Sequence, residues 1–465
     1  MFTLDTPMFT IKLKASTLKA STREKISRHR VISSMLLALA GCGGCGKSSA
    51  PAAPPPPSYT VAGNISGLKS GGMTLSSGAD KLAVLAGATS FTLPTALLAG
   101  TSYSVRISDQ PPRFTQHCAV ANGSGTIGNA NVTNVTVTCT DQVALVSTLA
   151  GTNNPTKFPI GLPSVFNEPQ GLAVDASGNV FVADRHNGRI AMITPTGTVS
   201  TFVGATPGQA PTDAERAFGY ADDITRDQNG NFYVVGNNMV RKITKDGLIT
   251  TVAGTTEIGY ADGTGTQARF NTPLGITVDT AGNLYVADTL NLRIRKITPA
   301  GVVTTVAGNG SRGMTDGPAL QASFDNPYGV AVDKAGNVFV ADTMNNLIRK
   351  LTPDGIVSTF AGHNSATDAG DGPGLQATVS QPSGVAVDTD NNLYVAELAG
   401  KVRTITPSAY VSTIAGQYGL NGFGTVDGIG SVATFRTPHG ITLDRAGNIY
   451  IGDSATGRVR KIVQQ

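Results

Sequence analysis

The chain has 465 residues, 40% of them hydrophobic, so it is long enough for two or three domains with at least one large core. Its 56 Gly and 25 Pro follow no collagen period and indicate many tight turns between short strands, which favours an all-β class. The basic surplus comes from the first 30 residues, which carry seven Lys or Arg. From Cys42 onward there are 28 basic and 29 acidic residues, a balance that argues against nucleic acid and anionic membrane surfaces as partners.

Residues 1–41 have the pattern of an export signal. A basic stretch is followed by the apolar run VISSMLLALA, which is too short to span a bilayer, and then by LAGC at 39–42. This ending resembles a bacterial lipobox, which implies cleavage before Cys42 and lipidation of that cysteine. Gly43 stands where an aspartate is the usual inner-membrane retention signal, so the resemblance favours an outer-membrane lipoprotein, periplasmic or surface-exposed. An ordinary signal peptide cut nearby is the alternative.

The next two segments are expected to be a tether and a small domain. Residues 42–57 are rich in Gly, Ser and Pro and are typical of an extended spacer. Residues 58–141 contain short alternating runs that predict a small β-sandwich. In an oxidising compartment Cys118 and Cys139 are expected to pair. A zinc site that uses Cys42 and Cys45 lacks a second pair of ligands.

Residues 143–465 consist of six similar copies of 52 to 56 residues. Each copy is marked by an aspartate after its first apolar strand: Asp175, Asp227, Asp279, Asp333, Asp388 and Asp444. The copy LGITVDTAGNLYVADTLNLRIRKITPAGVVTTVAG reads as four short antiparallel strands separated by turns. Because one such sheet cannot bury both faces alone, six of them predict a six-bladed β-propeller.

The repeated motifs Pro-x-Gly-[Ile/Val]-x-Val-Asp, Gly-Asn-[Leu/Val]-[Tyr/Phe]-Val-Ala-Asp and Ile-Arg-Lys-[Ile/Leu] resemble those of the NHL-repeat family. The outer-strand signature VSTxAG also occurs six times, but its first copy precedes the first blade and the last blade stops without one. Residues 143–151 are therefore expected to supply the outer strand of the sixth blade and to close the ring.

The recurring charged residues are interpreted as framework. The position of Asp342 is filled by acids in four other copies, whereas copy two has Gly236-Asn237 there. The position of Arg349 is filled by arginine in four other copies, whereas copy one has Ala191 there. The acid is expected to cap turn N–H groups and the arginine to project toward a neighbouring blade. Four Asp-Gly pairs in the long connections are interpreted as turns, with calcium binding as the lesser option. Residues 343–346, the loop that varies between copies, remain candidates for contact with a ligand.

A candidate ligand site lies where the copies differ, on the propeller face that carries the long loops between blades. The residue before the Gly of Pro-x-Gly should point at the mouth of the central channel. In copies one to six this position is occupied by Gln170, Asp222 (by alignment), Leu274, Tyr328, Ser383 and His439. This mixture suits a shallow binding surface for a protein, peptide or glycan, while unconstrained, solvent-facing positions are the alternative.

No catalytic residue, metal ligand or cofactor is assigned. The propeller contains only His186, His363 and His439, in different copies, and no nucleophile elbow or phosphate loop occurs. A metal-assisted propeller lyase or lactonase with His439 as general base remains the alternative to a binding protein, and a purely structural envelope module is a third possibility. Nucleic-acid binding is not expected, since residues 143–465 hold 23 basic and 26 acidic residues and no Trp.

Overall fold

The computed structural model describes residues 55–151, 166–205, 219–364, 370–418 and 424–465. The export signal, Cys42 and most of the tether lie outside these residues. The described chain is all-β, and its few helical turns are short 3-10 segments. Within the described ranges, no helix has the length and apolar character needed to cross a membrane.

The segment that precedes the repeats folds as a small β-domain with its own apolar core. One sheet has the order β5-β2-β11-β9, with β11 parallel to β2 and antiparallel to β9, and a second has the order β4-β3-β8. The strands are β1 (Ser58–Tyr59), β2 (Val61–Ser66), β3 (Met73–Ser77), β4 (Asp80–Val84), β5 (Ser90–Thr92), β6 (Leu97–Leu98), β7 (Ser102–Ser104), β8 (Arg106–Asp109), β9 (Gln116–Ala121), β10 (Ser124–Thr126) and β11 (Val132–Asp141).

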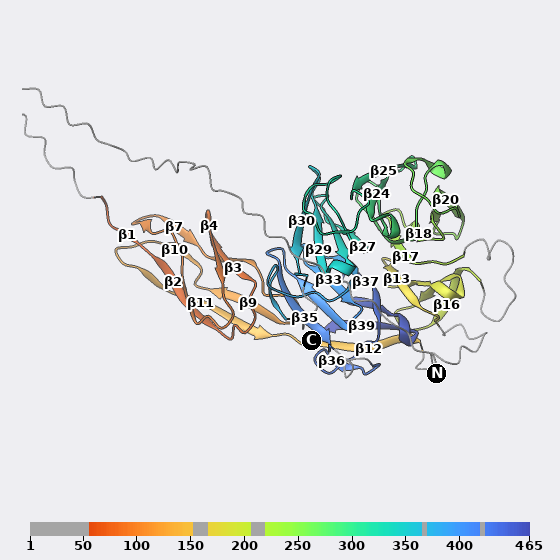
Figure 1. The fold of residues 1–465 in the computed structure, drawn as a ribbon. Helices are drawn as coiled ribbons and strands as arrows, with labels where there is room; N and C mark the ends of the chain where they lie inside the picture. Colours follow the sequence, from red (N-terminus) through yellow and green to blue (C-terminus); the bar gives the residue numbers. More distant parts are fainter. Residues whose placement is uncertain (1–54, 152–165, 206–218, 365–369, 419–423) are drawn as a thin grey trace, which may run out of the picture. The chain divides into compact units, whose positions relative to one another are not determined.

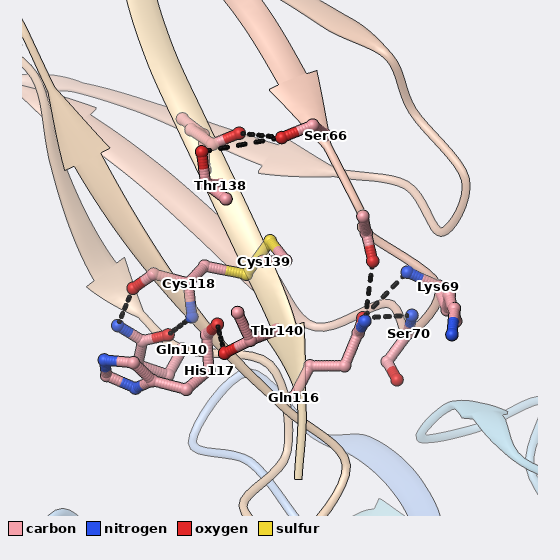
Figure 2. The surroundings of a disulfide bond; sticks show 12 residues. Ser66, Lys69, Ser70, Gln110, Gln116, His117, Cys118, Thr138, Cys139 and Thr140 are labelled. Carbon is pink, nitrogen blue, oxygen red and sulfur yellow. Dashed lines mark hydrogen bonds between the residues drawn. A yellow bond between two sulfur atoms is a disulfide. The ribbon is translucent and has the colours of Figure 1, made fainter.

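The predicted disulfide between Cys118 and Cys139 is present and links β9 to β11 (Figure 2). Beside it, the side chain of Gln116 hydrogen-bonds to backbone groups of the segment 67–70. Its Oε1 accepts the backbone N–H groups of Lys69 and Ser70, and its Nε2 donates to the carbonyl of Gly67. The alternating inward residues of these strands, such as Val61 and Val137, form the buried core of this domain.

The repeats form six antiparallel sheets that follow one another in chain order (Figure 1). From inner to outer strand, blades one and two contain β13 (Pro169–Val174), β14 (Val180–Asp184), β15 (Arg189–Ile193), β16 (Val199–Gly204), β17 (Asp223–Arg226), β18 (Phe232–Gly236), β19 (Met239–Ile243) and β20 (Ile249–Gly254). Blades three and four contain β22 (Pro273–Val278), β23 (Leu284–Asp288), β24 (Arg293–Ile297), β25 (Val302–Ala307), β27 (Pro327–Val332), β28 (Val338–Asp342), β29 (Leu347–Leu351) and β30 (Ile356–Ala361). Blades five and six contain β32 (Pro382–Val387), β33 (Leu393–Glu397), β34 (Lys401–Ile405), β35 (Tyr410–Gly416), β37 (Pro438–Leu443), β38 (Ile449–Asp453), β39 (Arg458–Gln464) and β12 (Ala144–Gly151).

The two ends of the repeat region meet in the sixth blade, because β12 pairs antiparallel with β39 (Figure 1). Each inner strand contacts the next one around the ring, and β37 returns to β13. Apolar side chains of adjacent blades then share cores, as where Tyr285 and Ala287 of blade three pack with Val330 and Val340 of blade four. The architecture is a six-bladed β-propeller.

Blades three to six carry a fifth, two-residue strand that the repeat pattern does not predict. These strands contain the glycines of the Asp-Gly pairs and extend the outer edge of each sheet: β21 (Gly263–Thr264), β26 (Gly317–Pro318), β31 (Gly372–Pro373) and β36 (Gly428–Ile429). Short 3-10 segments occupy the connections between the second and third strands of four blades, namely η1 (Arg185–Asn187), η3 (Thr289–Asn291), η4 (Thr343–Asn345) and η5 (Ser454–Thr456). One more, η2 (Gly265–Gln267), follows β21.

Candidate functional site

The recurring charged residues form an internal frame within each blade. The guanidinium of Arg349 is fully buried and donates to Asp342 Oδ2 at 2.8 Å and to Asp316 Oδ1 at 2.6 Å. Asp316 precedes β26, which pairs with β30 of the same sheet. The expected projection of the arginine toward a neighbouring blade is therefore wrong, because Asp342 lies on the second strand of its own blade and Asp316 on the chain that enters this blade.

The acid at the end of the second strand also binds the incoming chain, and it does not cap the backbone N–H groups of its own turn as expected. Asp342 Oδ1 accepts the backbone N–H of Asp325 at 2.7 Å, and its Oδ2 accepts Asn345 Nδ2, while η4 has no side-chain cap. Burial raises the pKa of Asp342 to about 6, against the opposing effects of Asn345, the Asp325 N–H and Arg349. Blade one, which has Ala191 in the arginine position, uses Arg189 to bind Asp184 at 2.7 Å instead.

Most of the variable loop 343–346 also belongs to this frame. Thr343 donates to the carbonyl of Pro382 in the next blade, and Asn345 donates to the carbonyl of Gly313. Asn346 accepts the backbone N–H of Gln381. Met344 alone in this loop is exposed, so little of it is available to a ligand.

The six variable residues of the inner strands come together at the channel axis, where they line one pocket of about 30 Å³. Gln170, Asp222 and Ser383 are buried, and the other three are partly buried, so none of the six is a freely solvated position. Glycines also line the pocket. A Cβ on Gly329 would overlap the carbonyl oxygen of Ser383, which shows how closely adjacent inner strands approach.

The hydroxyl of Ser383 is used inside the protein, in hydrogen bonds to backbone carbonyl groups. It lies 2.9 Å from the carbonyl oxygen of Pro438 and 3.1 Å from those of Ala396 and His439. It thus links blade five to blade six beneath the pocket. The rings of Tyr328 and His439, from the blades on either side, lie 5.4 Å apart between centroids.

Gln170 lines the pocket and carries an acceptor without a partner. Its side chain is 5% exposed, and its Oε1 is buried without a hydrogen-bond partner. A buried amide oxygen without a partner costs about 1–3 kcal/mol, and nearly all such atoms in folded proteins are satisfied by protein, water or ligand. This atom is therefore the strongest indication in the pocket of a missing hydrogen-bond donor.

Asp223 is a site residue that the sequence comparison did not single out. It stands where the other five copies have glycine, and its carboxylate fills the tight space beside Gly171. Its Oδ2 accepts the backbone N–H of Ile276 at 2.9 Å and its Oδ1 that of Ile224 at 2.8 Å. Burial raises the pKa of Asp223 to about 7, with these N–H groups opposing the rise and Asp222 adding to it.

Two charged neighbours of the pocket were also missed. Arg185, in η1, donates to Asp222 Oδ1 at 2.7 Å and to Glu168 Oε2 at 3.1 Å. Burial raises the pKa of Asp222, and Arg185 opposes this rise. The sequence shows this site by two differences from the repeat pattern. Arg185 replaces the Thr or Ser found in copies three, four and six, and Asp222-Asp223 replaces the x-Gly pair of the other copies.

The imidazole of His439 is uncharged at neutral pH, because burial lowers its pKa to about 4, although Glu168 opposes this effect. Burial raises the pKa of Tyr328 above the usual range, and the charge of Asp222 adds to this. Among the residues that the structure describes, no group of three or more His, Cys, Asp or Glu side chains could hold a metal ion. The pocket is a small recess of mixed polar and apolar lining with two aspartates at blade two.

Family models match four stretches of the repeat region. The NHL repeat matches residues 166–191, 270–297 and 435–462, and the teneurin NHL domain matches residues 309–373. The chain is 28% identical to human NHL repeat-containing protein 2 in an alignment 275 positions long, which covers 51% of this chain and 38% of that protein. It is 38% identical to the Arabidopsis thaliana protein SUPPRESSOR OF QUENCHING 1, chloroplastic, over 96 residues, which are 20% of this chain and 9% of that protein.

Solved structures share the fold at low identity. A structural genomics protein of unknown function from Bacteroides thetaiotaomicron has a TM-score of 0.55 and 19% identity, with 84% of this chain and 90% of that chain covered. An auxiliary nutrient binding protein from the same organism has a TM-score of 0.52 and 16% identity, with 87% and 98% covered. NHL repeats are therefore present at residues 166–191, 270–297 and 435–462, within a repeat region that folds as a β-propeller.

Proposed function

We propose that the protein is a lipid-anchored binding protein of the cell envelope, which uses the channel-mouth face of its propeller to bind a protein, peptide or glycan. The observation that carries the proposal is the convergence of six chemically different side chains, one from each blade, on a single axial pocket. A repeat framework needs no such variety, whereas recognition of a ligand does. The unpartnered Oε1 of Gln170 supports the same reading.

Anchoring through Cys42 and an outer-membrane location belong to this proposal and rest on the resemblance of LAGC to a lipobox. They are tested by mass spectrometry of the mature protein. A diacylglyceryl group on Cys42, lost together with membrane association in Cys42→Ser, supports the anchor, and an unmodified thiol contradicts it.

Binding at the mouth is tested with a tryptophan reporter, because the chain contains no Trp. Leu274 lines the pocket and has no polar group to lose, so Leu274→Trp places a single fluorophore at the mouth. Peptide and glycan libraries are screened by fluorescence, and a hit is expected to compete for the same site in the unmodified chain. Val302→Trp, at an exposed outer strand, is the control that should not respond.

The lyase or lactonase alternative has its own test. Stoichiometric metal in the purified full chain, or turnover of a lactone that His439→Ala abolishes, would replace binding with catalysis as the function.

A further inference from the structure

Among the groups that line the axial pocket, the unsatisfied one is a hydrogen-bond acceptor. Gln170 Oε1 is buried without a partner, and the carboxylates of Asp222 and Asp223 lie among the same lining residues. The contact between Asp222 and Arg185 engages Oδ1. A ligand that completes this pocket therefore has to bring N–H or O–H donors.

The charges around the pocket favour a cation. The lining residues include two aspartates and neither lysine nor arginine. The guanidinium of Arg185 is shared between Asp222 and Glu168, so two carboxylates face one permanent positive charge. Because burial lowers the pKa of His439, its ring is neutral at pH 7. The rings of His439 and Tyr328 also present aromatic faces, which interact favourably with a cation.

The size of the pocket restricts the cation to a compact group. A cavity needs about 10–15 Å³ of this kind of space to hold one water molecule, so about 30 Å³ admits one or two groups of that size. An ammonium group is a compact point charge with three donors, whereas a guanidinium is a wider planar fork. The closely packed glycines around the axis leave no room for the pocket to widen without movement of the inner strands.

We propose that this pocket recognises a primary ammonium group, with Gln170 Oε1 and the carboxylates of Asp222 and Asp223 as its acceptors. The inference rests on the proposed binding function and specifies the chemistry of the ligand. The ammonium belongs either to a lysine side chain of a peptide or to a small free amine.

The test uses the full chain and titration calorimetry with n-butylammonium chloride. n-Butanol has the same length without the charge, and tetramethylammonium has the charge without N–H donors, so both are expected to bind at least about 10-fold more weakly. Gln170→Met removes the unpartnered oxygen at nearly constant shape and is expected to weaken butylammonium binding about 10-fold or more. Gln376→Met, at an exposed position away from the pocket, should bind as the wild type does.

A second variant keeps the test valid if Gln170→Met does not fold. Asp222→Asn retains an oxygen for Arg185 but removes the negative charge, and it should also weaken butylammonium binding about 10-fold. Equal affinity for butanol, or wild-type affinity in the pocket variants, would overturn the inference.

A peptide acetyl-Gly-Lys-Gly-amide that binds more tightly than butylammonium assigns the ammonium to a lysine side chain, and equal affinity assigns it to a small amine. If no amine binds while library ligands still report through Leu274→Trp, the binding function stands and the ammonium inference fails.

Discussion

A carboxylate at a position that five other blades fill with glycine is the sharpest departure from the repeat. Asp223 lies in the crowded ring of inner strands, where burial disfavours its charged form and two backbone N–H groups offset only part of that cost. A residue that was selected for packing alone would be glycine here, as in the other blades. The cost of Asp223 is consistent with a role at the mouth of the channel.

The variant Asp223→Gly should change how stability depends on pH. The pKa of Asp223 is about 7 in the folded protein and near 4 in an unfolded chain, so the folded state binds the extra proton and loses stability as pH rises from 4 to 7. The free energy of unfolding of the variant, relative to that of the wild type, should therefore increase by on the order of 1–3 kcal/mol from pH 5 to pH 8. Urea unfolding at both pH values measures this, and an identical difference between variant and wild type at both would contradict it.

Two buried glutamines should respond oppositely to the same substitution. Gln170 Oε1 has no partner, so Gln170→Met removes a desolvated oxygen and should leave the melting temperature unchanged or higher. Gln116 is 3% exposed and satisfies two N–H groups and a carbonyl, so Gln116→Met should cost about 1–3 kcal/mol (Figure 2). Thermal unfolding of the two variants side by side decides this. A similar loss in both would mean that Gln170 is structural.

Within a blade, one buried arginine joins the incoming chain to the second and third strands. Asp342 and Arg349 are both fully buried, whereas the side chain of Asp316 is 46% exposed. Arg349→Leu leaves the Asp342 carboxylate buried without its cation and should cost about 3–5 kcal/mol. Asp316→Ala removes an exposed partner and should cost about 1 kcal/mol or less. Urea unfolding compares the two, and an Asp316→Ala loss as large as that of Arg349→Leu would show that the outer pair is the main link.

The sequence predicted the elements of a blade better than the contacts between them. Alternating strands, turn residues and six copies were enough for the all-β propeller, because these depend on local periodicity. The direction of Arg349 was predicted wrongly and the use of Ser383 in packing was not foreseen, since both depend on residues 13 or more positions away. The Gln170 oxygen without a partner was not foreseen either, because a missing hydrogen bond leaves no pattern in the sequence. The fifth strands were missed because two residues carry no periodic signal.

At the scale of the whole molecule, the pocket depends on closure of the ring. Gln170 in blade one and His439 in blade six meet only because the sixth blade is held against the first, and the carbonyl of Gln170 lies directly at Gly440. The last blade takes its outer strand from β12, whose Val146 and Ala144 enter the core of that blade. Loss of β12 should thus affect both the fold and the site.

A chain that starts at Asn167 should melt at a lower temperature than one that starts at Val143 and keeps β12. The shorter chain exposes the outer edge of β39, removes the hydrogen bonds of the β12 ladder and uncovers the apolar side chains against which Val146 packs. In the full chain, Val146→Asp places a charge at a position that is 1% exposed and should act in the same direction, while Ser147→Asp on the exposed side of the strand should be nearly neutral. Differential scanning calorimetry of the four proteins measures the effect. Equal melting temperatures for the two shortened chains would show that the ring closes through contacts of the inner strands alone.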